Sequence, residues 1–263
     1  MTSIDPRVEQ AAEALYQARR TRVPIPPISR ALGITSPDLA YSIQEANTAR
    51  WLGEGRKPTG RKIGLTSEAI QKQLGVGEPD YGMLWGDLGF EDGAAIPIHR
   101  FAQPRAEAEI AFTMSATIDS PEATMEDVKA AVGSVMAAVE IADSAIAGWK
   151  ITLADTIADN ASGGGYVLGR ERRALADVDL EGCRMQLSLN RSPASQGVGS
   201  ACLGNPLNAV MWLAKKMAEV KRPLSAGDLV LSGALGPMVD VHAGDRVDVE
   251  IEGFSPIRLR FDE

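Results

Sequence analysis

Apolar residues near the start of the chain recur every three or four positions, which is the spacing of one helix face. The first set consists of Val8, Ala11, Ala12 and Leu15. The second set consists of Leu39, Ala40, Ile43 and Ala46. Asp5-Pro6 and Ser36-Pro37 stand just ahead of these sets, and each pairs a capping side chain with a proline suited to the first turn. The pattern therefore predicts two N-terminal helices, the second ending near Gly53.

Two further helices are predicted in the rest of the chain. A short one follows Thr66-Ser67, with Ile70 and Leu74 on one face and Gly75 at its end. A longer one opens at Asn205-Pro206. Its apolar face carries Leu207, Val210, Met211, Ala214 and Met217.

From Gly60 onward, short apolar runs between glycines and prolines are typical of strands. The predicted strands span residues 62–65, 107–113, 135–142 and 165–168. Near the C-terminus, apolar residues alternate in 247–251 and again in 257–261, with Glu252-Gly253 beginning the turn between them. This alternation predicts a C-terminal hairpin.

One predicted strand contains two acidic residues, Glu107 and Glu109, within an apolar run. Alternate side chains of a strand share a face, so these carboxylates project together while the apolar residues around them face a core. Such a pair loses hydration and repels itself, so it requires a proton, a basic partner or a metal ion. The simpler interpretation is an exposed acidic face neutralised by Arg105; the alternative is a hard divalent cation.

Composition excludes several classes of protein. With 263 residues, 44% of them hydrophobic, the chain can bury a sizeable core. The formal net charge of -8, without a stripe of lysine or arginine, predicts no nucleic-acid partner. No basic segment followed by an apolar one opens the chain, and no run approaches the roughly 20 apolar residues of a membrane span, so we expect a cytoplasmic protein.

The cysteines and histidines offer little chemistry. Cys183 and Cys202 lack the spacing of a zinc site and are expected to stay reduced. His99 and His242 both stand beside turn signals. A catalytic set of the Ser-His-Asp or Cys-His type is therefore poorly supported.

Several other segments place a polar side chain among small or apolar residues. They are Gly60-Arg61-Lys62-Ile63-Gly64-Leu65-Thr66, Glu78-Pro79-Asp80-Tyr81-Gly82, Val139-Glu140-Ile141-Ala142-Asp143 and Ala158-Asp159-Asn160-Ala161-Ser162-Gly163. Together with the acidic pair and Leu231-Ser232-Gly233-Ala234-Leu235-Gly236-Pro237, they resemble the 2-hydroxypenta-2,4-dienoate hydratases, also called 2-keto-4-pentenoate hydratases. This family is part of the fumarylacetoacetate hydrolase superfamily, and the resemblance runs from about Ser36 to the C-terminus.

The resemblance implies a role for each matching residue. It implies a magnesium or manganese ion held by Glu107, Glu109 and Glu140. It places Lys62 and Asp80 near the substrate as joint acid-base carriers, with a lowered Lys62 pKa expected beside a cation.

Ser162 matches a family position that hydrogen-bonds substrate or attacking water.

Taken without the resemblance, Lys62, Asp80, Glu140 and Ser162 also have simpler interpretations. Lys62 can extend to solvent, Asp80 can stabilise a turn, and Glu140 can be a solvated helix acid. Ser162 can likewise be an ordinary loop serine.

The implied substrate is a 2-hydroxydienoate, or the related 2-oxo acid, that chelates the ion through its carboxylate and adjacent oxygen. We expect it to be contacted by Leu65, Ser232, Gly233 and Leu235. The uncharged stretch 232–238 favours a short or apolar tail, as in pentadienoate. Many relatives have arginine after the Asp-Ser pair, whereas Ala145 stands here, which either widens the pocket or changes a surface contact.

Three functions are compatible with these motifs. The first is a hydratase that forms 4-hydroxy-2-oxopentanoate in aromatic meta-cleavage catabolism. The second is a 2-oxo-acid decarboxylase of the 4-oxalocrotonate type, or a hydratase of a longer 2-oxo-ene-dioate. The third is a scaffold that binds a decarboxylase, which retention of Lys62 and the glutamates argues against. The Ala234-Leu235-Gly236-Pro237 stretch favours the hydratase over the decarboxylase.

The expected fold is mixed α/β. A helical cap or assembly region is predicted for residues 1–60, and a catalytic domain of curled mixed β-sheet for residues 61–263. The resemblance also implies a homo-oligomer, with a decamer of two stacked pentameric rings as one form, and a complex with a decarboxylase.

Overall fold

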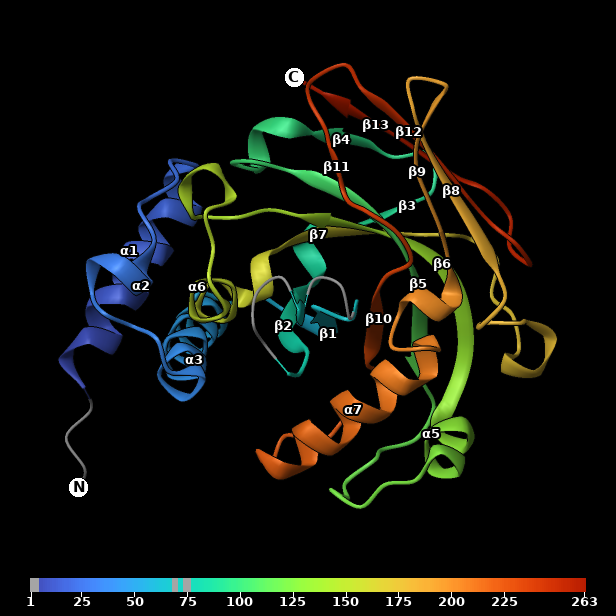
Figure 1. Ribbon diagram of the computed structural model, residues 1–263, viewed down its shortest axis with the longest axis horizontal. Coiled ribbons are helices and arrows are strands. Elements are labelled where there is room, and N and C mark those ends of the chain that lie inside the picture. Colours follow the sequence, from blue (N-terminus) through green and yellow to red (C-terminus); the bar gives the residue numbers. More distant parts are fainter. Residues whose placement is uncertain (1–4, 68–70, 73–76) are drawn as a thin grey trace.

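The computed structural model describes residues 5–67, 71–72 and 77–263. Its helices are α1 (Pro6–Thr21), α2 (Ile28–Ala31), α3 (Pro37–Gly53), α5 (Met125–Ala131), α6 (Leu153–Ala158) and α7 (Pro206–Glu219). Figure 1 shows α1, α2, α3 and α6 gathered at one side of the molecule, beside the sheets. Ile70, Leu74 and Gly75, on which the helix predicted after Thr66-Ser67 depends, lie outside the described residues.

Two of the three predicted capping side chains cap their helices. The Asp5 side chain accepts a hydrogen bond from Arg7 N at the start of α1, and Asn205 accepts one from Leu207 N at the start of α7. The predicted apolar face of α1 is buried. α3 begins at Pro37 as predicted, but the Ser36 side chain makes no capping hydrogen bond.

The larger sheet is mixed and curled. Its strands are β1 (Pro58–Gly64), β2 (Asp80–Trp85), β3 (Gly89–Glu91), β5 (Arg105–Met114), β6 (Val132–Ala142), β7 (Gly163–Leu168), β10 (Leu229–Ala234) and β11 (Val239–Asp240). Their order is β2-β1-β10-β5-β6-β7-β3, and β11 pairs with β5. The β1–β10 and β3–β7 pairs are parallel, whereas β5 is antiparallel to both β10 and β6.

A second sheet is formed by β4 (Ala95–Pro97), β8 (Arg184–Leu189), β9 (Ser192–Val198), β12 (Arg246–Ile251) and β13 (Ile257–Asp262). The order is β4-β13-β12-β8-β9. β12 and β13 are antiparallel, with Val249 opposite Ile257, so the predicted C-terminal hairpin is confirmed. Both sheets and the helices agree with the predicted mixed α/β class.

Hydrophobic clusters hold these parts together. The main cluster joins β5 and β6 to α7 and the smaller sheet. The second joins α1, α2 and α3 to α6 and to Ala145 and Ile146. We call α1, α2, α3 and α6 the helical lobe. Since α6 comes from outside residues 1–60, the lobe draws on both predicted regions, and the boundary near residue 60 stays a prediction.

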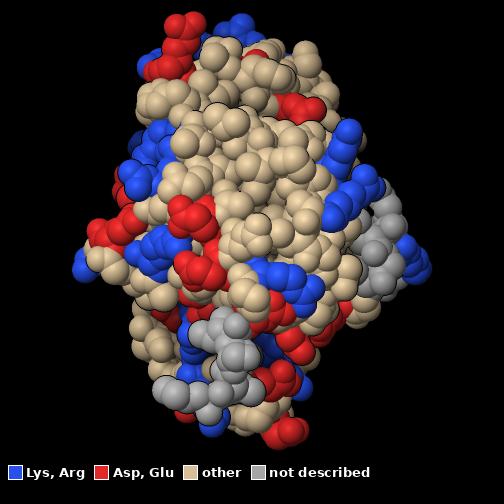
Figure 2. Space-filling model, turned by 90° about the vertical axis from the view of Figure 1, so that its left-hand side faces the viewer, with Lys and Arg blue, Asp and Glu red and all other residues tan. Residues whose placement is uncertain are grey.

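The helical lobe is tied to the larger sheet by a buried amide. Gln44 of α3 donates hydrogen bonds of 2.9 Å to Tyr81 O of β2 and of 2.9 Å to Ile157 O of α6. On the face of the molecule that this lobe occupies, acidic and basic side chains intermix around a broad uncharged area (Figure 2). Among the described helices, none combines the length and apolar character needed to cross a membrane.

Candidate metal centre and active site

Three carboxylates meet on one face of the larger sheet. Glu107 of β5 lies directly opposite Glu140 of β6, and Glu109 follows two residues later on the same face. One oxygen from each residue lies within 4.8 Å of the others. We call this set the glutamate centre. Glu109 and Glu140 are buried, whereas Glu107 is partly exposed and is the member nearest solvent.

Several oxygens of the glutamate centre lack a partner within the described part of the chain. Glu109 Oε2 accepts a hydrogen bond from Gly233 N at 2.9 Å, but Glu109 Oε1 accepts none. Neither oxygen of Glu140 accepts a well-aligned hydrogen bond, although Oε1 lies 3.2 Å from Lys62 Nζ. An unsatisfied buried acceptor costs about 1–3 kcal/mol. These hard oxygen donors fit a divalent cation of the magnesium or manganese kind.

The simpler interpretation of the acidic pair is wrong. Arg105, the expected neutralising neighbour, places its Nε 2.6 Å from Asp240 Oδ1 and its guanidinium 4.5 Å from the ring centre of Trp149. The cation in contact with the glutamates is Lys62 of β1, which is 4% exposed, and Arg105 acts on Glu107 less strongly than Lys62 does. Glu140 lies in a buried strand, not in a solvated helix.

Burial raises the pKa of all three glutamates, and repulsion between them adds to this at Glu107 and Glu109. Burial, reinforced by Glu140, raises the pKa of Glu107 to about 7. Burial is also the main cause that raises the pKa of Glu109 and of Glu140. Burial by itself would lower the pKa of Lys62, but Glu140 and the other carboxylates outweigh it and raise that pKa. The carboxylates without a metal ion therefore favour the ammonium form of Lys62. The lowered pKa expected beside a bound cation stays a prediction.

Lys62 and Asp80 converge over a glycine. Asp80, the first residue of β2, lies opposite Gly64 of β1. A Cβ atom at Gly64 would lie 2.2 Å from Asp80 Oδ1 and 3.3 Å from Lys62 Nζ, so glycine leaves room for both groups. Asp80 is 1% exposed, and burial raises its pKa. Its Oδ1 accepts no hydrogen bond from the described residues, which leaves that oxygen available to a ligand.

Thr156 of α6 is a further residue of the site that was not predicted from the sequence. Its hydroxyl donates a hydrogen bond of 3.2 Å to Asp80 Oδ2 and lies 3.2 Å from Ser162 Oγ. The side chain is buried and joins the predicted acid-base residue to the predicted serine. A threonine in the short, mostly apolar segment Leu153–Ala158 was the available signal.

An unusual turn presents Ser162. Asn160, Ala161 and Ser162 have φ angles of 58°, 52° and 50°, in the left-handed region that costs non-glycine residues about 1 kcal/mol or more each. The Asn160 side chain holds the turn by accepting from Met83 N at 2.7 Å and donating to Met83 O at 3.0 Å. The turn directs Ala161 O towards Lys62 Nζ, which donates to it at 2.8 Å.

The four predicted substrate contacts separate into two groups. Gly233, with φ of 103°, donates to Glu109, and Leu65 directly follows the strand that carries Lys62. Their contact with substrate stays a prediction. Ser232 Oγ instead accepts from the backbone at 3.3 Å and donates to Gly233 O at 3.0 Å. Leu235 is fully buried in the main hydrophobic cluster, which argues against a substrate contact through its side chain.

Comparison with known proteins gives the family. The sequence pattern named fumarylacetoacetate (FAA) hydrolase C-terminal matches residues 59–262. A "TodF product hydratase" of Pseudomonas putida is 48% identical over 97% of this chain and 95% of its own. A 2-keto-4-pentenoate hydratase of Paraburkholderia xenovorans is 47% identical over 97% of this chain and 94% of its own. The chain belongs to the 2-keto-4-pentenoate hydratase family. The predicted family and its enzymatic, hydro-lyase character are confirmed.

Solved structures place this family member on a known fold. The 4-oxalocrotonate decarboxylase from Pseudomonas putida G7, complexed with magnesium and adipate, has a TM-score of 0.91 at 30% identity and covers 96% of this chain and 97% of its own. A fumarylpyruvate hydrolase from Pseudomonas aeruginosa shares the fold alone, with a TM-score of 0.59 at 12% identity over 78% of this chain and 89% of its own. The decarboxylase structure contains magnesium, and the glutamate centre offers oxygen ligands of the kind that such an ion prefers. Both observations support a divalent metal cofactor.

The departure from the family pattern at Ala145 concerns the helical lobe. Ala145 is 1% exposed within the second hydrophobic cluster, and its N–H donates to Asp159 Oδ2 at 2.7 Å. The guanidinium beside Asp143 comes from Arg19 of α1, whose Nη1 lies 3.3 Å from Asp143 Oδ2. This buried position does not fit a changed surface contact, whereas the wider pocket stays a prediction.

Proposed function

We propose that this protein is a divalent-metal-dependent hydratase that adds water to 2-hydroxypenta-2,4-dienoate, or to a close alkyl analogue. The product would be 4-hydroxy-2-oxopentanoate, formed in aromatic meta-cleavage catabolism. The observation that carries this proposal is the glutamate centre with Lys62 and Asp80 beside it. A 2-hydroxyhexa-2,4-dienoate hydratase of Comamonas testosteroni, 40% identical over 97% of this chain and 98% of its own, supports including analogues with a longer tail.

Glu107, Glu109 and Glu140 would hold a magnesium or manganese ion. When bound, that ion would stabilise negative charge on the substrate carboxylate and the adjacent oxygen. The Gly233 N–H bond to Glu109 Oε2 fixes one ligand's orientation, as outer hydrogen bonds do at many metal sites. The partly exposed Glu107 leaves the solvent side of the centre open to water or substrate.

Lys62 and Asp80 are the proposed proton carriers. Ketonisation of the dienol places a proton at C5, and hydration then adds hydroxyl at C4 and a proton at C3. Lys62, held as an ammonium by the carboxylates, can donate a proton or stabilise developing negative charge. Asp80 has a raised pKa and a free Oδ1, so it can exchange a proton with substrate or with the incoming water. Ser162, linked to Asp80 through Thr156, would orient that water.

The second candidate is decarboxylation of 4-oxalocrotonate. The close structural match with a 4-oxalocrotonate decarboxylase supports it, but that protein is 30% identical, whereas named hydratases reach 48%. A hydratase acting on a longer 2-oxo-ene-dioate would need a basic group for the distal acid. The 232–238 stretch contains none.

We also propose a homo-oligomer, with a decamer as one form, and a complex with a decarboxylase. The homo-oligomer rests on the family resemblance alone, and the similarity to a decarboxylase of the same fold supports the complex. Analytical ultracentrifugation of the purified protein tests the first, and co-sedimentation with 4-oxalocrotonate decarboxylase tests the second.

The experiment that tests the activity supplies purified protein with Mg²⁺ or Mn²⁺ and 2-hydroxypenta-2,4-dienoate. Consumption of the dienoate and release of 4-hydroxy-2-oxopentanoate, lost on chelation and restored by metal, are the expected results. A folded, metal-loaded sample that leaves the dienoate unchanged would refute the hydratase. Carbon dioxide release from 4-oxalocrotonate would reverse the ranking of the two candidates.

A further inference from the structure

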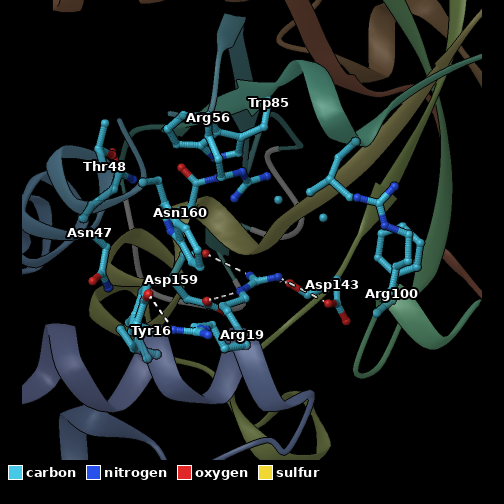
Figure 3. Close-up of a pocket in the computed structure, with 18 of the residues that line it drawn as sticks. Tyr16, Arg19, Asn47, Thr48, Arg56, Trp85, Arg100, Asp143, Asp159 and Asn160 are labelled. Carbon is cyan, nitrogen blue, oxygen red and sulfur yellow. Dashed lines mark hydrogen bonds and ion pairs between the residues drawn. The ribbon is translucent and has the colours of Figure 1, made fainter. Parts of the chain in front are cut away.

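A second polar region lies between the helical lobe and the edge of the larger sheet. It is a cavity of about 300 Å³, and its lining includes the arginines Arg19, Arg20, Arg22, Arg56 and Arg100. We call it the arginine cavity. No residue of the glutamate centre lines it. In Figure 3 the labelled Arg19, Arg56 and Arg100 approach it from three different directions.

Positive charge exceeds negative charge around this cavity. Five arginines line it, but the acidic lining residues are Asp87, Asp143 and Asp159. Asp143 and Asp159 both pair with Arg19, at 3.3 Å and 2.7 Å. Two guanidinium groups are therefore not matched by a lining carboxylate.

The remaining arginines share one aspartate or use neutral partners. Asp87 is 3.0 Å from Arg56 and 3.7 Å from Arg100, so one carboxylate serves two cations. Arg22 Nε donates to Arg100 O at 2.6 Å, and Arg20 donates to a tyrosine hydroxyl at 3.1 Å. Arg22 is exposed at the rim of the cavity. Partial burial lowers its pKa, attraction from Asp143 opposes this, and repulsion from Arg100 and Arg19 adds to the lowering. An added anion would relieve this repulsion.

Packing holds part of this charge in place before any ligand arrives. The Arg56 guanidinium lies 4.9 Å from the ring centre of Trp51 and 4.6 Å from that of Trp85. The Arg100 guanidinium lies 5.9 Å from the ring centre of Phe90. A planar guanidinium fixed in this way loses little further freedom when it binds an oxyanion through paired hydrogen bonds.

We propose that the arginine cavity binds a small oxyanion, a carboxylate or a phosphate, at a site separate from the glutamate centre. The volume suits a small molecule, and the excess charge selects an anion. The partition between this site and Lys62 is thin, because Gly163 lines the cavity and a Cβ atom there would lie 3.8 Å from Lys62 Cδ. Binding here does not depend on the proposed reaction.

Isothermal titration calorimetry of the full-length, metal-loaded protein tests the proposal, with inorganic phosphate in one arm and succinate in the other. A separate titration with chloride at the same ionic strength controls for salt effects. The variants are Arg22→Gln and Arg100→Gln, from different walls of the cavity. Arg30→Gln is the matched control, because Arg30 is an exposed arginine of the same helical lobe that does not line the cavity.

We expect saturable binding of at least one probe, weakened about tenfold or more by each cavity variant and unchanged by the control. The arm that responds identifies the ligand as carboxylate or phosphate. Absence of saturable binding in both arms would overturn the proposal. So would equal affinity of the two cavity variants and the control, since the ion would then bind elsewhere, for example at the metal or Lys62.

Discussion

The glutamate centre and the arginine cavity concentrate opposite charges, and the protein balances them differently. In the glutamate centre, Lys62 faces three carboxylates whose positions follow from strand register, and buried oxygens stay without partners. In the arginine cavity, aspartates and aromatic rings from several elements already contact most of the cations. Buried carboxylate oxygens without hydrogen-bond partners predict a tightly held metal ion in the glutamate centre. The partly balanced excess of positive charge in the arginine cavity predicts a weaker, exchangeable ligand.

The largest effect should come from removing a ligand of the glutamate centre. Glu107→Ala deletes the oxygen donors nearest solvent, so we expect metal affinity to fall and turnover to drop by about a thousandfold or more. Steady-state kinetics and metal titration measure both losses. Glu250→Ala, which changes an exposed glutamate of β12, is the control and should behave like the parent protein. Unchanged turnover in Glu107→Ala would discredit the metal assignment.

Replacing Lys62 separates proton transfer from metal binding. Lys62→Met keeps the length of the side chain and removes the ammonium 3.2 Å from Glu140. We expect turnover to fall by about 10²–10⁴-fold while the metal still binds, because general acid-base catalysis has this size. Single-turnover kinetics with metal-saturated protein is the measurement. Normal turnover in a metal-loaded Lys62→Met sample would exclude Lys62 as a proton carrier.

Replacing Arg19 should lower the stability of the fold more than it lowers turnover. The side chains of Asp143 and Asp159 are 4% and 2% exposed, so Arg19→Met would leave two buried acids without their cation. Breaking a buried ion pair costs about 3–5 kcal/mol in free energy of unfolding. Urea denaturation of Arg19→Met against Arg30→Met, an exposed site, measures it. Equal stabilities would mean that the helical lobe does not depend on this bridge.

A smaller effect is expected at Thr156. Thr156→Val keeps the shape but removes the hydroxyl between Asp80 and Ser162, so turnover should fall by about tenfold. Thr156→Ser restores the hydroxyl and should recover most of the activity. The pH profile of kcat distinguishes a positioning role, because loss of the bond to Asp80 Oδ2 should move the acidic limb towards higher pH. If valine and serine behave alike, the hydroxyl has no such role.

The mildest test changes only pH. Burial and Glu140 raise the pKa of Glu107 from 4.5 to about 7. A carboxyl group with a raised folded-state pKa stabilises the fold at low pH and loses that contribution as the pH rises from 4.5 through 7. The contribution of Glu107 should therefore make metal-free protein melt at a lower temperature above this window than below it. Metal binding needs the carboxylate, so affinity should rise across the same window, and titrations on either side of pH 7 measure it.

Local patterns predicted much of the fold and two of the three residues of the glutamate centre. Proline with a capping residue marked the starts of α1, α3 and α7, and alternation marked β5 and the C-terminal hairpin. Alternation also placed Glu107 and Glu109 on one face. The position of Glu140 opposite Glu107 is a matter of strand pairing, which no local pattern contains, and the family resemblance supplied it.

Contacts between distant elements explain what could not be predicted. Thr156 reaches Asp80 across 76 positions of sequence, and Arg19 reaches Asp159 across 140. Neither pair has a periodic or motif-like signal, because each depends on how the helical lobe packs against the larger sheet. The same packing explains Ala145, whose buried position could not be known before the lobe was seen.

The most direct test of the glutamate centre is a crystal structure of the protein grown with Mn²⁺, with the ion located by its anomalous scattering. We expect one ion bound by carboxylate oxygens of Glu107, Glu109 and Glu140 at about 2.0–2.4 Å, with Lys62 and Asp80 beside it. An ion bound elsewhere, or glutamates that pair with Lys62 and leave no room for an ion, would contradict the account.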